Sequence, residues 1–181
     1  LHRKSLFKRR APGARREFQL IAANVDTAFI VSSCNQDFSV ARLERYLALA
    51  FEADVIPVII LTKADLCDDP APYLGAASAI SQKVSVILLN ALSDEPRAKL
   101  RDWCGRDQTI AFIGSSGVGK STLVNALFGN QAVDTASIRE DDARGRHTTT
   151  RRQLHFLPDG CAVLDTPGMR ELQLADAQKG I

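Results

Sequence analysis

Short apolar runs alternate with helix-like patterns through the middle of the chain. The runs at residues 28–31, 55–61, 84–89 and 109–113 are rich in β-branched side chains and carry no charge. Such runs are typical of parallel strands that helices cover on both faces of a sheet. The alternation therefore predicts an α/β fold with a mainly parallel sheet and helices on both of its faces.

The segments between these runs predict the helices. Ser39 can cap a helix whose apolar side chains recur at about every third or fourth residue, at Val40, Leu43, Leu47, Ala50 and Phe51. Weaker patterns predict helices over residues 73–81 and 95–103, the second with Leu100 and Trp103 facing inward. A further helix follows the last apolar run and ends at Gly129, since glycine is a common C-terminal stop.

The first 13 residues and the segment after residue 129 show weaker patterns. Residues 1–13 include a Pro-Gly pair and lack apolar periodicity, so we expect a connector rather than a packed element. Residues 130–150 also lack a clear period and predict a long loop. Beyond that loop, residues 153–157 and 161–164 flank a Pro-Asp-Gly turn, which predicts a β-hairpin.

The basic residues are concentrated at the N-terminus. The chain has 181 residues, 45% of them hydrophobic, which suffices for one domain with a real core. Its net charge of +2 conceals an asymmetry, because seven of the 23 basic residues and only one acidic residue lie in residues 1–17. This basic segment indicates either a polyanionic partner such as RNA or a solvated arm.

Cysteine spacing and hydropathy indicate which cellular compartment to expect. The four cysteines, Cys34, Cys67, Cys104 and Cys161, form no C-x-x-C pair and have no histidine at ligand spacing, which argues against a metal site among them. No signal-peptide pattern opens the chain, and no apolar run approaches the ~18 residues of a membrane span. We therefore expect a cytoplasmic protein with buried, reduced thiols and no membrane partner.

The most specific motif directly follows the apolar run at residues 109–113. It has the spacing G-x-x-x-x-G-K-[ST] and reads Gly114-Ser115-Ser116-Gly117-Val118-Gly119-Lys120-Ser121-Thr122. Its glycines let the backbone wrap around phosphate oxygens, so that successive N–H groups and the N-terminus of the next helix point at the anion. In this phosphate loop, Lys120 is expected to reach the β- and γ-phosphates and Ser121 to supply its hydroxyl to Mg²⁺.

Two further segments predict contacts to the γ-phosphate and the metal ion. Asp165 opens an Asp-Thr-Pro-Gly sequence at a strand end, where its carboxylate can hold Mg²⁺ through water and the Gly168 N–H can meet the γ-phosphate. The preceding loop contains His147 and three threonines, of which we favour Thr150 as a metal ligand and Thr149 second. Loops that order around a γ-phosphate signal the nucleotide state in such proteins.

Base selection is predicted from a variant of N-K-x-D at the end of a buried strand, Thr62-Lys63-Ala64-Asp65. The Asp65 carboxylate can accept hydrogen bonds from guanine N1–H and the 2-amino group, and adenine offers neither donor there. Lys63 is expected to lie along the base plane. Thr62 replaces the usual asparagine, and its hydroxyl can substitute, at shorter reach, for the amide that ties this loop to the phosphate loop.

A weaker base-binding motif follows the next strand. Asn90-Ala91-Leu92 resembles the S-A-K or S-A-L segment whose backbone N–H meets the guanine oxygen. With this segment, four predicted strand ends carry nucleotide motifs. Open α/β sheets bring such strand ends together at one edge, where a single nucleotide can contact all of them.

Taken in order, these motifs resemble a circularly permuted GTPase of the RsgA (YjeQ/EngC) family, ribosome-associated enzymes of bacteria. The resemblance rests on T-K-A-D, then G-S-S-G-V-G-K-S-T, G-R-H-T-T-T and D-T-P-G, with the leading R-K-S-L-F-K-R-R segment. It covers nearly the whole chain and is specific, because the usual GTPases place the base-reading motif last. It implies binding of GTP and GDP with Mg²⁺, and hydrolysis of GTP that the small ribosomal subunit stimulates.

The resemblance also implies flanking modules. Family members carry an N-terminal oligonucleotide-binding barrel and a C-terminal zinc-binding module. Residues 1–17 are then the basic connector from the barrel, residues 18–175 the GTPase domain and residues 176–181 the start of a linker to the zinc module. Zinc is expected only in that absent module. The implied partners are the small ribosomal subunit and its rRNA, and we expect a monomer.

The expected reaction is attack of water on the γ-phosphate, with the transition-state charge held by Lys120, the metal ion and the loop amides. Met169 occupies the position where many GTPases have a water-orienting glutamine. His147 is therefore the best internal candidate for orienting or deprotonating the water. The same loop is flanked by arginines that are either ordinary exposed residues or contacts for RNA phosphates, namely Arg144, Arg146, Arg151 and Arg152.

Three alternative functions stay open on the sequence. An ATP-dependent enzyme would share the phosphate loop, but Asp65 disfavours adenine. A nucleotide-gated RNA- or ribosome-binding module with negligible intrinsic hydrolysis would agree with Met169. A GTPase of large-subunit assembly would share the permuted motif order, but the G-R-H-T-T-T segment and the basic N-terminus fit the small-subunit type better.

Overall fold

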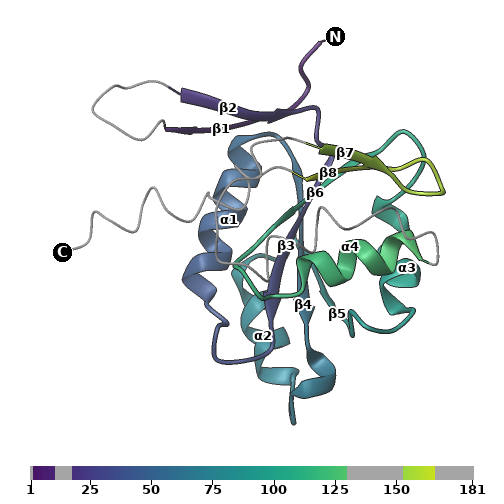
Figure 1. The fold of residues 1–181 in the computed structure, drawn as a ribbon. Helices are drawn as coiled ribbons and strands as arrows, with labels where there is room; N and C mark the ends of the chain where they lie inside the picture. Colours follow the sequence, from purple (N-terminus) through teal and green to yellow (C-terminus); the bar gives the residue numbers. More distant parts are fainter. Residues whose placement is uncertain (1, 11–17, 130–152, 166–181) are drawn as a thin grey trace, which may run out of the picture.

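The computed structural model describes residues 2–10, 18–129 and 153–165 and has a six-stranded sheet at its centre (Figure 1). The strand order is β5-β4-β3-β6-β8-β7. The strands are β3 (Thr27–Ser33), β4 (Ile56–Thr62), β5 (Ser85–Leu88), β6 (Thr109–Ile113), β7 (Gln153–Phe156) and β8 (Ala162–Asp165). All neighbouring strands are parallel except β7 and β8, which form an antiparallel hairpin. The predicted parallel sheet and C-terminal hairpin are confirmed.

Helices cover both faces of this sheet (Figure 1). They are α1 (Val40–Glu52), α2 (Ala71–Ile80), α3 (Glu95–Lys99) and α4 (Lys120–Phe128), with 3-10 turns η1 (Ala64–Leu66) and η2 (Arg101–Trp103). One apolar core lies under α1 and α2, and a second lies under α3 and α4. Strand β3 separates the two cores, because Ile30 packs into the first and Phe29 into the second.

The chain connections diverge between β3 and β6. From β3 the chain runs through α1 to β4, whereas from β6 it runs through α4 to the hairpin of β7 and β8 on the other side of the sheet order. Neighbouring strands whose connections leave in opposite directions define a crevice at their carboxyl ends, and open α/β sheets bind ligands there. The fold therefore points to the edge where β3 and β6 end.

Helix α1 forms largely as predicted. The Ser39 hydroxyl accepts a hydrogen bond from the Arg42 N–H at 3.4 Å, which caps the N-terminus. The buried stripe contains Leu43, Tyr46, Leu47 and Ala50. The prediction was wrong for Phe51, whose side chain is 54% exposed. At about 100° per residue, Phe51 lies roughly 90° from the centre of this stripe, and Tyr46 fills the interior position instead.

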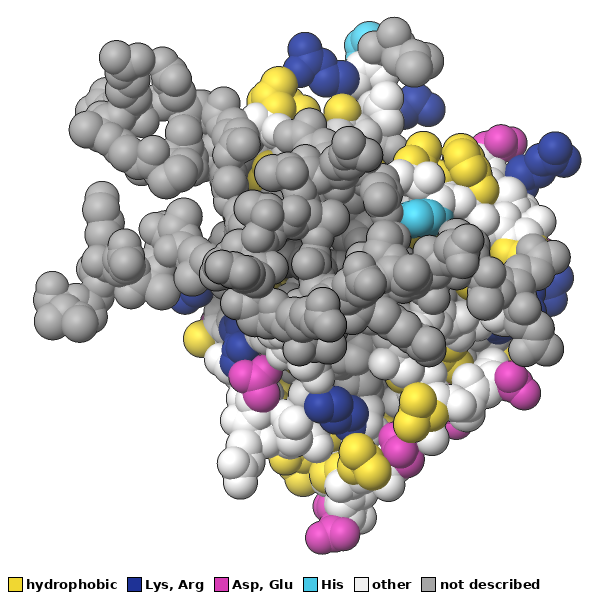
Figure 2. Space-filling model, viewed as in Figure 1, with side chains coloured by type: hydrophobic (Ala, Val, Ile, Leu, Met, Phe, Trp, Pro, Cys, Tyr) yellow, Lys and Arg dark blue, Asp and Glu magenta, His cyan; other side chains and the backbone are white. Residues whose placement is uncertain are grey.

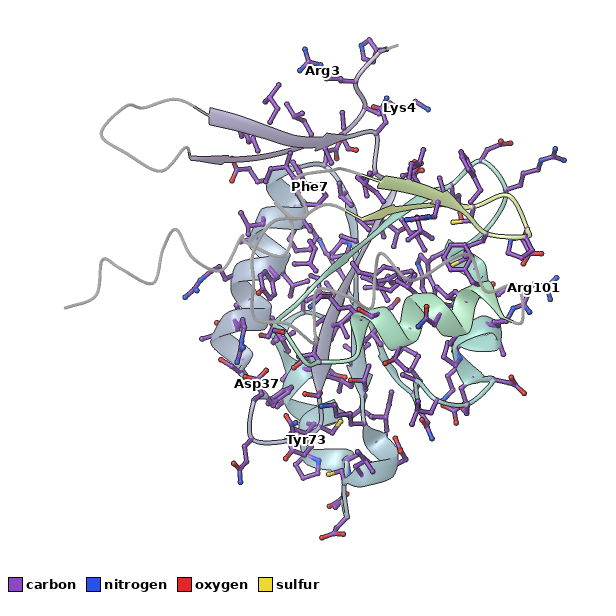
Figure 3. All side chains as sticks on the ribbon, in the orientation of Figure 1. Arg3, Lys4, Phe7, Asp37, Tyr73 and Arg101 are labelled. Atoms are coloured by element: carbon purple, nitrogen blue, oxygen red, sulfur yellow. The ribbon has the colours of Figure 1, made fainter. Side chains whose placement is uncertain are left out.

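A two-stranded antiparallel hairpin precedes the central sheet and lies beside α1 (Figure 1). Its strands are β1 (Leu6–Arg10) and β2 (Phe18–Ala23). Phe7 is buried in the core under α1, towards which it points in Figure 3, and the Leu6 N–H donates to the Ala53 carbonyl at 3.0 Å. The expectation of an unpacked connector over residues 1–13 is therefore wrong for β1. The sequence analysis missed this hairpin because only a few of its side chains, among them Phe7 and Ile21, are buried in the core. The proposed domain limits stay predictions.

The remaining predicted helices differ from the observed ones at their ends. The helix expected over residues 73–81 begins two residues earlier, because the Asp69 carboxylate accepts from the Ala71 N–H at 3.0 Å. The helix expected over residues 95–103 divides into α3 and η2. Leu100 between them is fully buried as expected, whereas Trp103 is only half-buried.

The cysteines are free thiols. Cys34, Cys104 and Cys161 are buried as expected, but Cys67 is only half-buried. Burial, helped by the nearby Cys67, raises the pKa of Cys34 to about 11. A hydrogen bond with Cys161, together with burial, raises the pKa of Cys104. These two buried thiols are thus protonated and poorly nucleophilic at neutral pH.

The described surface mixes basic and acidic side chains (Figure 2). Arg3 and Lys4 project at the N-terminal end of the hairpin of β1 and β2 (Figure 3). Lys8 on this hairpin forms an ion pair with Glu52 of α1, at 3.3 Å. Within the described residues, none of the helices has the length and apolar character needed to cross a bilayer.

Candidate nucleotide-binding site

The phosphate loop leaves the carboxyl end of β6 at Gly114. Gly114 has φ of +154°, and a Cβ atom there would lie 2.3 Å from the carbonyl oxygen of Val31 in β3. Only glycine permits this approach, so β3 and the loop are in van der Waals contact at the base of the crevice. Gly117 and Gly119 also have positive φ, of +76° and +96°. The two glycines that the motif requires, Gly114 and Gly119, thus both lie where the backbone has a positive φ.

The loop is buried at Val118 and exposed at its tip. The Val118 side chain is buried in the core under α4, whereas Ser116 and Gly117 are exposed. Helix α4 begins directly after Gly119, with Ser121 and Thr122 half-buried in its first turn. The N–H groups at a helix N-terminus favour an anion, so this arrangement is suited to binding phosphate.

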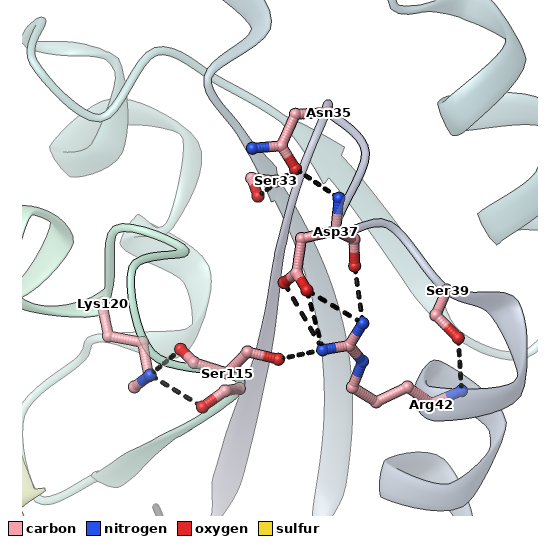
Figure 4. A network of polar contacts seen from close by, with 8 residues as sticks. Ser33, Asn35, Asp37, Ser39, Arg42, Ser115 and Lys120 are labelled. Atoms are coloured by element: carbon pink, nitrogen blue, oxygen red, sulfur yellow. Dashed lines mark hydrogen bonds and ion pairs between the residues drawn. The ribbon is translucent and has the colours of Figure 1, made fainter.

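Lys120 lies across this loop (Figure 4). Its ammonium donates to the Gly114 carbonyl at 2.7 Å and to the Ser115 carbonyl. The charge predicted to reach the β- and γ-phosphates is therefore held at the loop itself. Because Lys120 is half-buried, its interactions are partly shielded from water.

The base-reading segment touches the phosphate loop through Thr62, the last residue of β4. Thr62 is fully buried, and its hydroxyl donates to the Val118 carbonyl at 2.6 Å, with the Ser32 carbonyl at 3.2 Å. A Cβ atom on Gly119 would lie 3.6 Å from the same hydroxyl oxygen. The structure thus contains the predicted tie, in which a threonine hydroxyl replaces an asparagine amide.

The chain turns sharply after Thr62. Lys63 has φ of +58°, in the left-handed region, and the 3-10 turn over Ala64–Leu66 follows. This turn leaves Asp65 exposed at the carboxyl edge of the sheet, with Leu66 exposed beside it. A carboxylate at that edge is accessible to a ligand whose phosphates occupy the neighbouring loop.

The third segment, residues 90–92, is held by side chains that the sequence analysis missed. The Asn90 N–H donates to Glu95 Oε2 at 3.1 Å, and Lys99 Nζ donates to the same oxygen at 2.9 Å and to the Leu88 carbonyl at 2.8 Å. The hydrogen bond from Lys99, and then that from Asn90, hold the pKa of Glu95 below its usual value. A carboxylate seven residues after the end of β5 could have suggested this role.

Within residues 90–92, the backbone forms a tight turn. The Leu92 N–H donates to Asn90 Oδ1 at 2.8 Å, and the Ser93 hydroxyl donates to the Asn90 carbonyl at 2.9 Å. Ala91 is buried, whereas the Leu92 side chain is 80% exposed. An exposed leucine at the edge that also carries Asp65 offers an apolar surface for a planar base.

The predicted metal and γ-phosphate residues are only partly described. Asp165 ends β8, which pairs in parallel with β6, so its backbone lies beside the strand that leads into the phosphate loop. The other predicted residues lie outside the described residues, namely His147, Thr148, Thr149, Thr150, Gly168, Met169, Arg144, Arg146, Arg151 and Arg152. Hydroxyl and carboxylate oxygens, as on Ser121 and Asp165, are the hard ligands that Mg²⁺ prefers.

Arg42 also contacts the phosphate loop, and the sequence analysis missed it. Its Nη1 donates to the Ser115 hydroxyl and to the Asp37 carboxylate at 3.2 Å, and its Nη2 donates to the Asp37 carbonyl at 2.7 Å (Figure 4). Arg42 and Ser115 are 73 residues apart in the chain. No local pattern could have predicted that they meet.

The sheet is mainly parallel and carries a glycine loop at its carboxyl edge, and the base-reading segment comes earlier in the chain than that loop. These features define a circularly permuted P-loop domain. The family model described as RsgA GTPase matches residues 1–175. The chain therefore belongs to the RsgA GTPase family.

Similar proteins agree with this membership. The small ribosomal subunit biogenesis GTPase RsgA 2 of Vibrio parahaemolyticus is 56% identical over 181 residues, which cover 100% of this chain and 51% of that protein. The small ribosomal subunit biogenesis GTPase RsgA of Mesorhizobium japonicum is 54% identical over 184 residues, which cover 100% of this chain and 53% of that protein. The chain thus spans about half the length of these relatives.

Two solved structures have the same fold. The crystal structure of YjeQ from Thermotoga maritima matches with a TM-score of 0.71 and 25% identity, over 96% of this chain and 55% of that one. The structure of YloQ, described as a circularly permuted GTPase, matches with a TM-score of 0.59 and 29% identity, over 85% of this chain and 48% of that one. Both support the permuted P-loop architecture.

Proposed function

We propose that this chain binds GTP and GDP at the carboxyl edge of its sheet and hydrolyses GTP during biogenesis of the small ribosomal subunit. The observation that carries the proposal is the 2.6 Å hydrogen bond from Thr62 to Val118, which brings the base-reading segment against the phosphate loop. One nucleotide can then be contacted by both. The names of the 56% and 54% identical relatives supply the ribosomal context.

Guanine selection is assigned to the loops after β4 and β5. The Asp65 carboxylate would accept from guanine N1–H and the 2-amino group, and Lys63 would lie along the ring. The turn at Asn90-Ala91-Leu92 would present a backbone N–H to the guanine oxygen. Adenine lacks the donors that Asp65 needs, so ATP would leave this carboxylate without partners.

Phosphate binding is assigned to the loop from Gly114 to Thr122. Its N–H groups and the N-terminus of α4 would surround the phosphates, and Lys120 would move from the loop carbonyls to the β- and γ-phosphates. Ser121, Asp165 and Thr150 would hold Mg²⁺, which neutralises phosphate charge when bound. The Gly168 N–H would contact the γ-phosphate, and His147 would orient or deprotonate the attacking water.

The proposed partners follow from the ribosomal context. The small subunit and its rRNA would contact the basic segments of the chain, including the four arginines between residues 144 and 152. Replacing these arginines should flatten the salt dependence of subunit binding, and an unchanged slope would exclude them as contacts. A protein that acts on maturing bacterial subunits works in the cytoplasm, and we propose that it does so as a monomer.

A competition experiment with the full chain tests the guanine assignment. GTP and GDP should displace fluorescently labelled GDP, and ATP should not. Asp65→Asn should lose guanine binding and gain xanthine binding, because an amide can donate to the 2-carbonyl that xanthine has in place of the amino group. Asp68→Asn, at an exposed aspartate three residues on, is the matched control. Equal displacement by ATP would exclude a guanine-specific site.

Phosphate release, measured with and without small ribosomal subunits, tests hydrolysis. We expect the subunits to accelerate release, and we expect His147→Ala to lose most of this stimulation. If His147→Ala kept full stimulated hydrolysis, histidine would have no part in activating the water. Nucleotide binding without phosphate release under either condition would favour a nucleotide-gated binding module, the alternative that agrees with Met169.

A further inference from the structure

Ser115 in the phosphate loop is held from two sides by basic side chains (Figure 4). Lys120, from the loop and α4, donates to the Ser115 carbonyl. Arg42, from the first turn of α1, donates to the Ser115 hydroxyl. Ser115 is only 8% exposed, so these interactions are shielded from solvent. Arg42 is thus a cation against the phosphate loop that comes from outside the nucleotide-binding motifs.

Arg42 is itself fixed by the segment between β3 and α1. Its two terminal nitrogens donate to the carboxylate and the backbone carbonyl of Asp37. The Asp37 N–H donates in turn to Asn35 Oδ1 at 3.0 Å, and the Ser33 hydroxyl donates to the same oxygen at 2.9 Å. A planar guanidinium can serve Asp37 and Ser115 at once, whereas the single ammonium of lysine lacks that forked geometry.

This contact lies where the topology places a ligand. Asp37 follows β3 and Ser115 follows β6, and these neighbouring parallel strands are where the chain connections diverge. Gly114 fixes the loop backbone against Val31 of β3. Arg42 fixes the side chain of the next residue, so the first part of the loop is attached to the β3 side of the crevice at two successive positions.

We propose that Arg42 is a positioning residue for nucleotide binding. By holding Ser115, it keeps the first half of the phosphate loop in the geometry that surrounds the β- and γ-phosphates. It acts through Ser115 and not on the phosphates themselves. A loop ordered before binding loses less conformational entropy when the nucleotide arrives, which raises affinity. The inference rests on the proposed binding of GTP and GDP by this loop.

A double-mutant cycle on nucleotide affinity tests this role. Arg42→Ala and Ser115→Ala should each weaken binding of fluorescently labelled GDP and GTP by about tenfold, the size expected for one charge-assisted hydrogen bond. The double variant should bind about as weakly as either single variant, because both changes remove the same contact. Effects that multiply to about a hundredfold would overturn the proposal, since Arg42 would then not act through Ser115.

Arg45 provides the matched control. It lies three residues further along α1 and is exposed, so Arg45→Ala removes the same charge from the same helix without touching the loop. We expect Arg45→Ala to bind nucleotide as the unaltered chain does. Arg42→Lys should restore affinity only in part, to within about threefold of the unaltered chain. Equal losses in Arg42→Ala and Arg45→Ala would show a general charge effect and refute the inference.

One further measurement separates positioning from a purely structural role. The phosphorus NMR signal of the β-phosphate in bound GDP should shift in Arg42→Ala but not in Arg45→Ala. If Arg42→Ala does not fold, Asp37→Asn takes its place. Asp37→Asn should weaken nucleotide binding, and adding Ser115→Ala to it should not weaken binding further. Absence of nucleotide binding by the unaltered chain would refute the proposed function as well. Normal binding by both it and Arg42→Ala would refute this inference alone.

Discussion

At the scale of single residues, the site depends on short polar side chains placed against backbone carbonyls. The Thr62 hydroxyl reaches Val118, 56 positions away in the chain, because β4 ends close to the phosphate loop. Gly114 acts in the opposite way, by having no side chain where the Val31 carbonyl approaches. Thr62 thus fixes the loop to β4, and Gly114 lets the loop pack directly on β3.

Replacing Thr62 with valine keeps the shape of the side chain and removes the hydrogen-bond donor. The buried Val118 carbonyl then loses this partner, which should lower the free energy of unfolding by about 1–3 kcal/mol. Affinity for GDP should fall too, because the two loops are no longer tied. Urea denaturation and GDP titration measure the two effects. Thr62→Ser retains the hydroxyl and is the control, and equal behaviour of the two variants would show that the tie is unimportant.

Two glycine-to-alanine substitutions should have opposite effects on stability. Gly114→Ala places a Cβ atom 2.3 Å from the Val31 carbonyl, so the backbone must shift, and we expect a loss of at least ~2 kcal/mol together with weaker nucleotide binding. Gly75→Ala in α2 meets nothing within 4 Å and should gain ~0.5–1 kcal/mol from helix propensity. Urea denaturation of both variants checks the signs. A neutral Gly114→Ala would contradict the close packing of the loop on β3.

At the scale of elements, burial decides what the sequence could predict. The strands β3, β4 and β6 are covered on both faces, so their apolar runs were unmistakable. The hairpin of β1 and β2 places few side chains in the core and therefore shows no periodicity. The glycines and Lys120 could be predicted because a local motif specifies them. Arg42 could not be predicted, because its partner Ser115 is near only in the folded chain.

The turn that contains Asn90 should weaken at low pH. Glu95 has a lowered pKa because Lys99 and the Asn90 N–H donate to its carboxylate, and this stabilisation requires the ionised form. It is fully present above the ordinary glutamate pKa and is lost as the pH falls through the lowered value. Glu95→Gln should therefore be less stable than the unaltered chain near about pH 7, and the difference should vanish in acid.

Denaturation of the two proteins at neutral and acid pH measures this difference. Amide hydrogen exchange at Asn90 reports the turn directly, and we expect faster exchange in Glu95→Gln at neutral pH. Asp94→Asn, which removes the preceding exposed carboxylate, serves as the control. A stability difference between Glu95→Gln and the unaltered chain that persisted unchanged into acid would show that the charge of Glu95 is not the cause.

At the scale of the whole molecule, one sheet separates two cores and brings distant motifs to one edge. The base-reading segment precedes the phosphate loop in the chain, yet β4 and β6 both flank β3. Chain order therefore does not limit the site, because parallel strands deliver their carboxyl ends to the same edge. Rigidity of this edge depends on the packing of both cores against β3.

Substitutions in different cores should have independent effects on stability, although the residues are adjacent in β3. Phe29 and Ile30 point to opposite faces, so the losses from Phe29→Leu and Ile30→Val should add to within about 0.5 kcal/mol. Phe29 and Phe112 share one core, with ring centroids 5.3 Å apart, and Phe29→Leu combined with Phe112→Leu should depart from additivity by more than that. Urea denaturation of the single and double variants measures both couplings. Strong coupling between positions 29 and 30 would mean that the sheet transmits packing changes from one face to the other, and the two cores would then have to be treated as one.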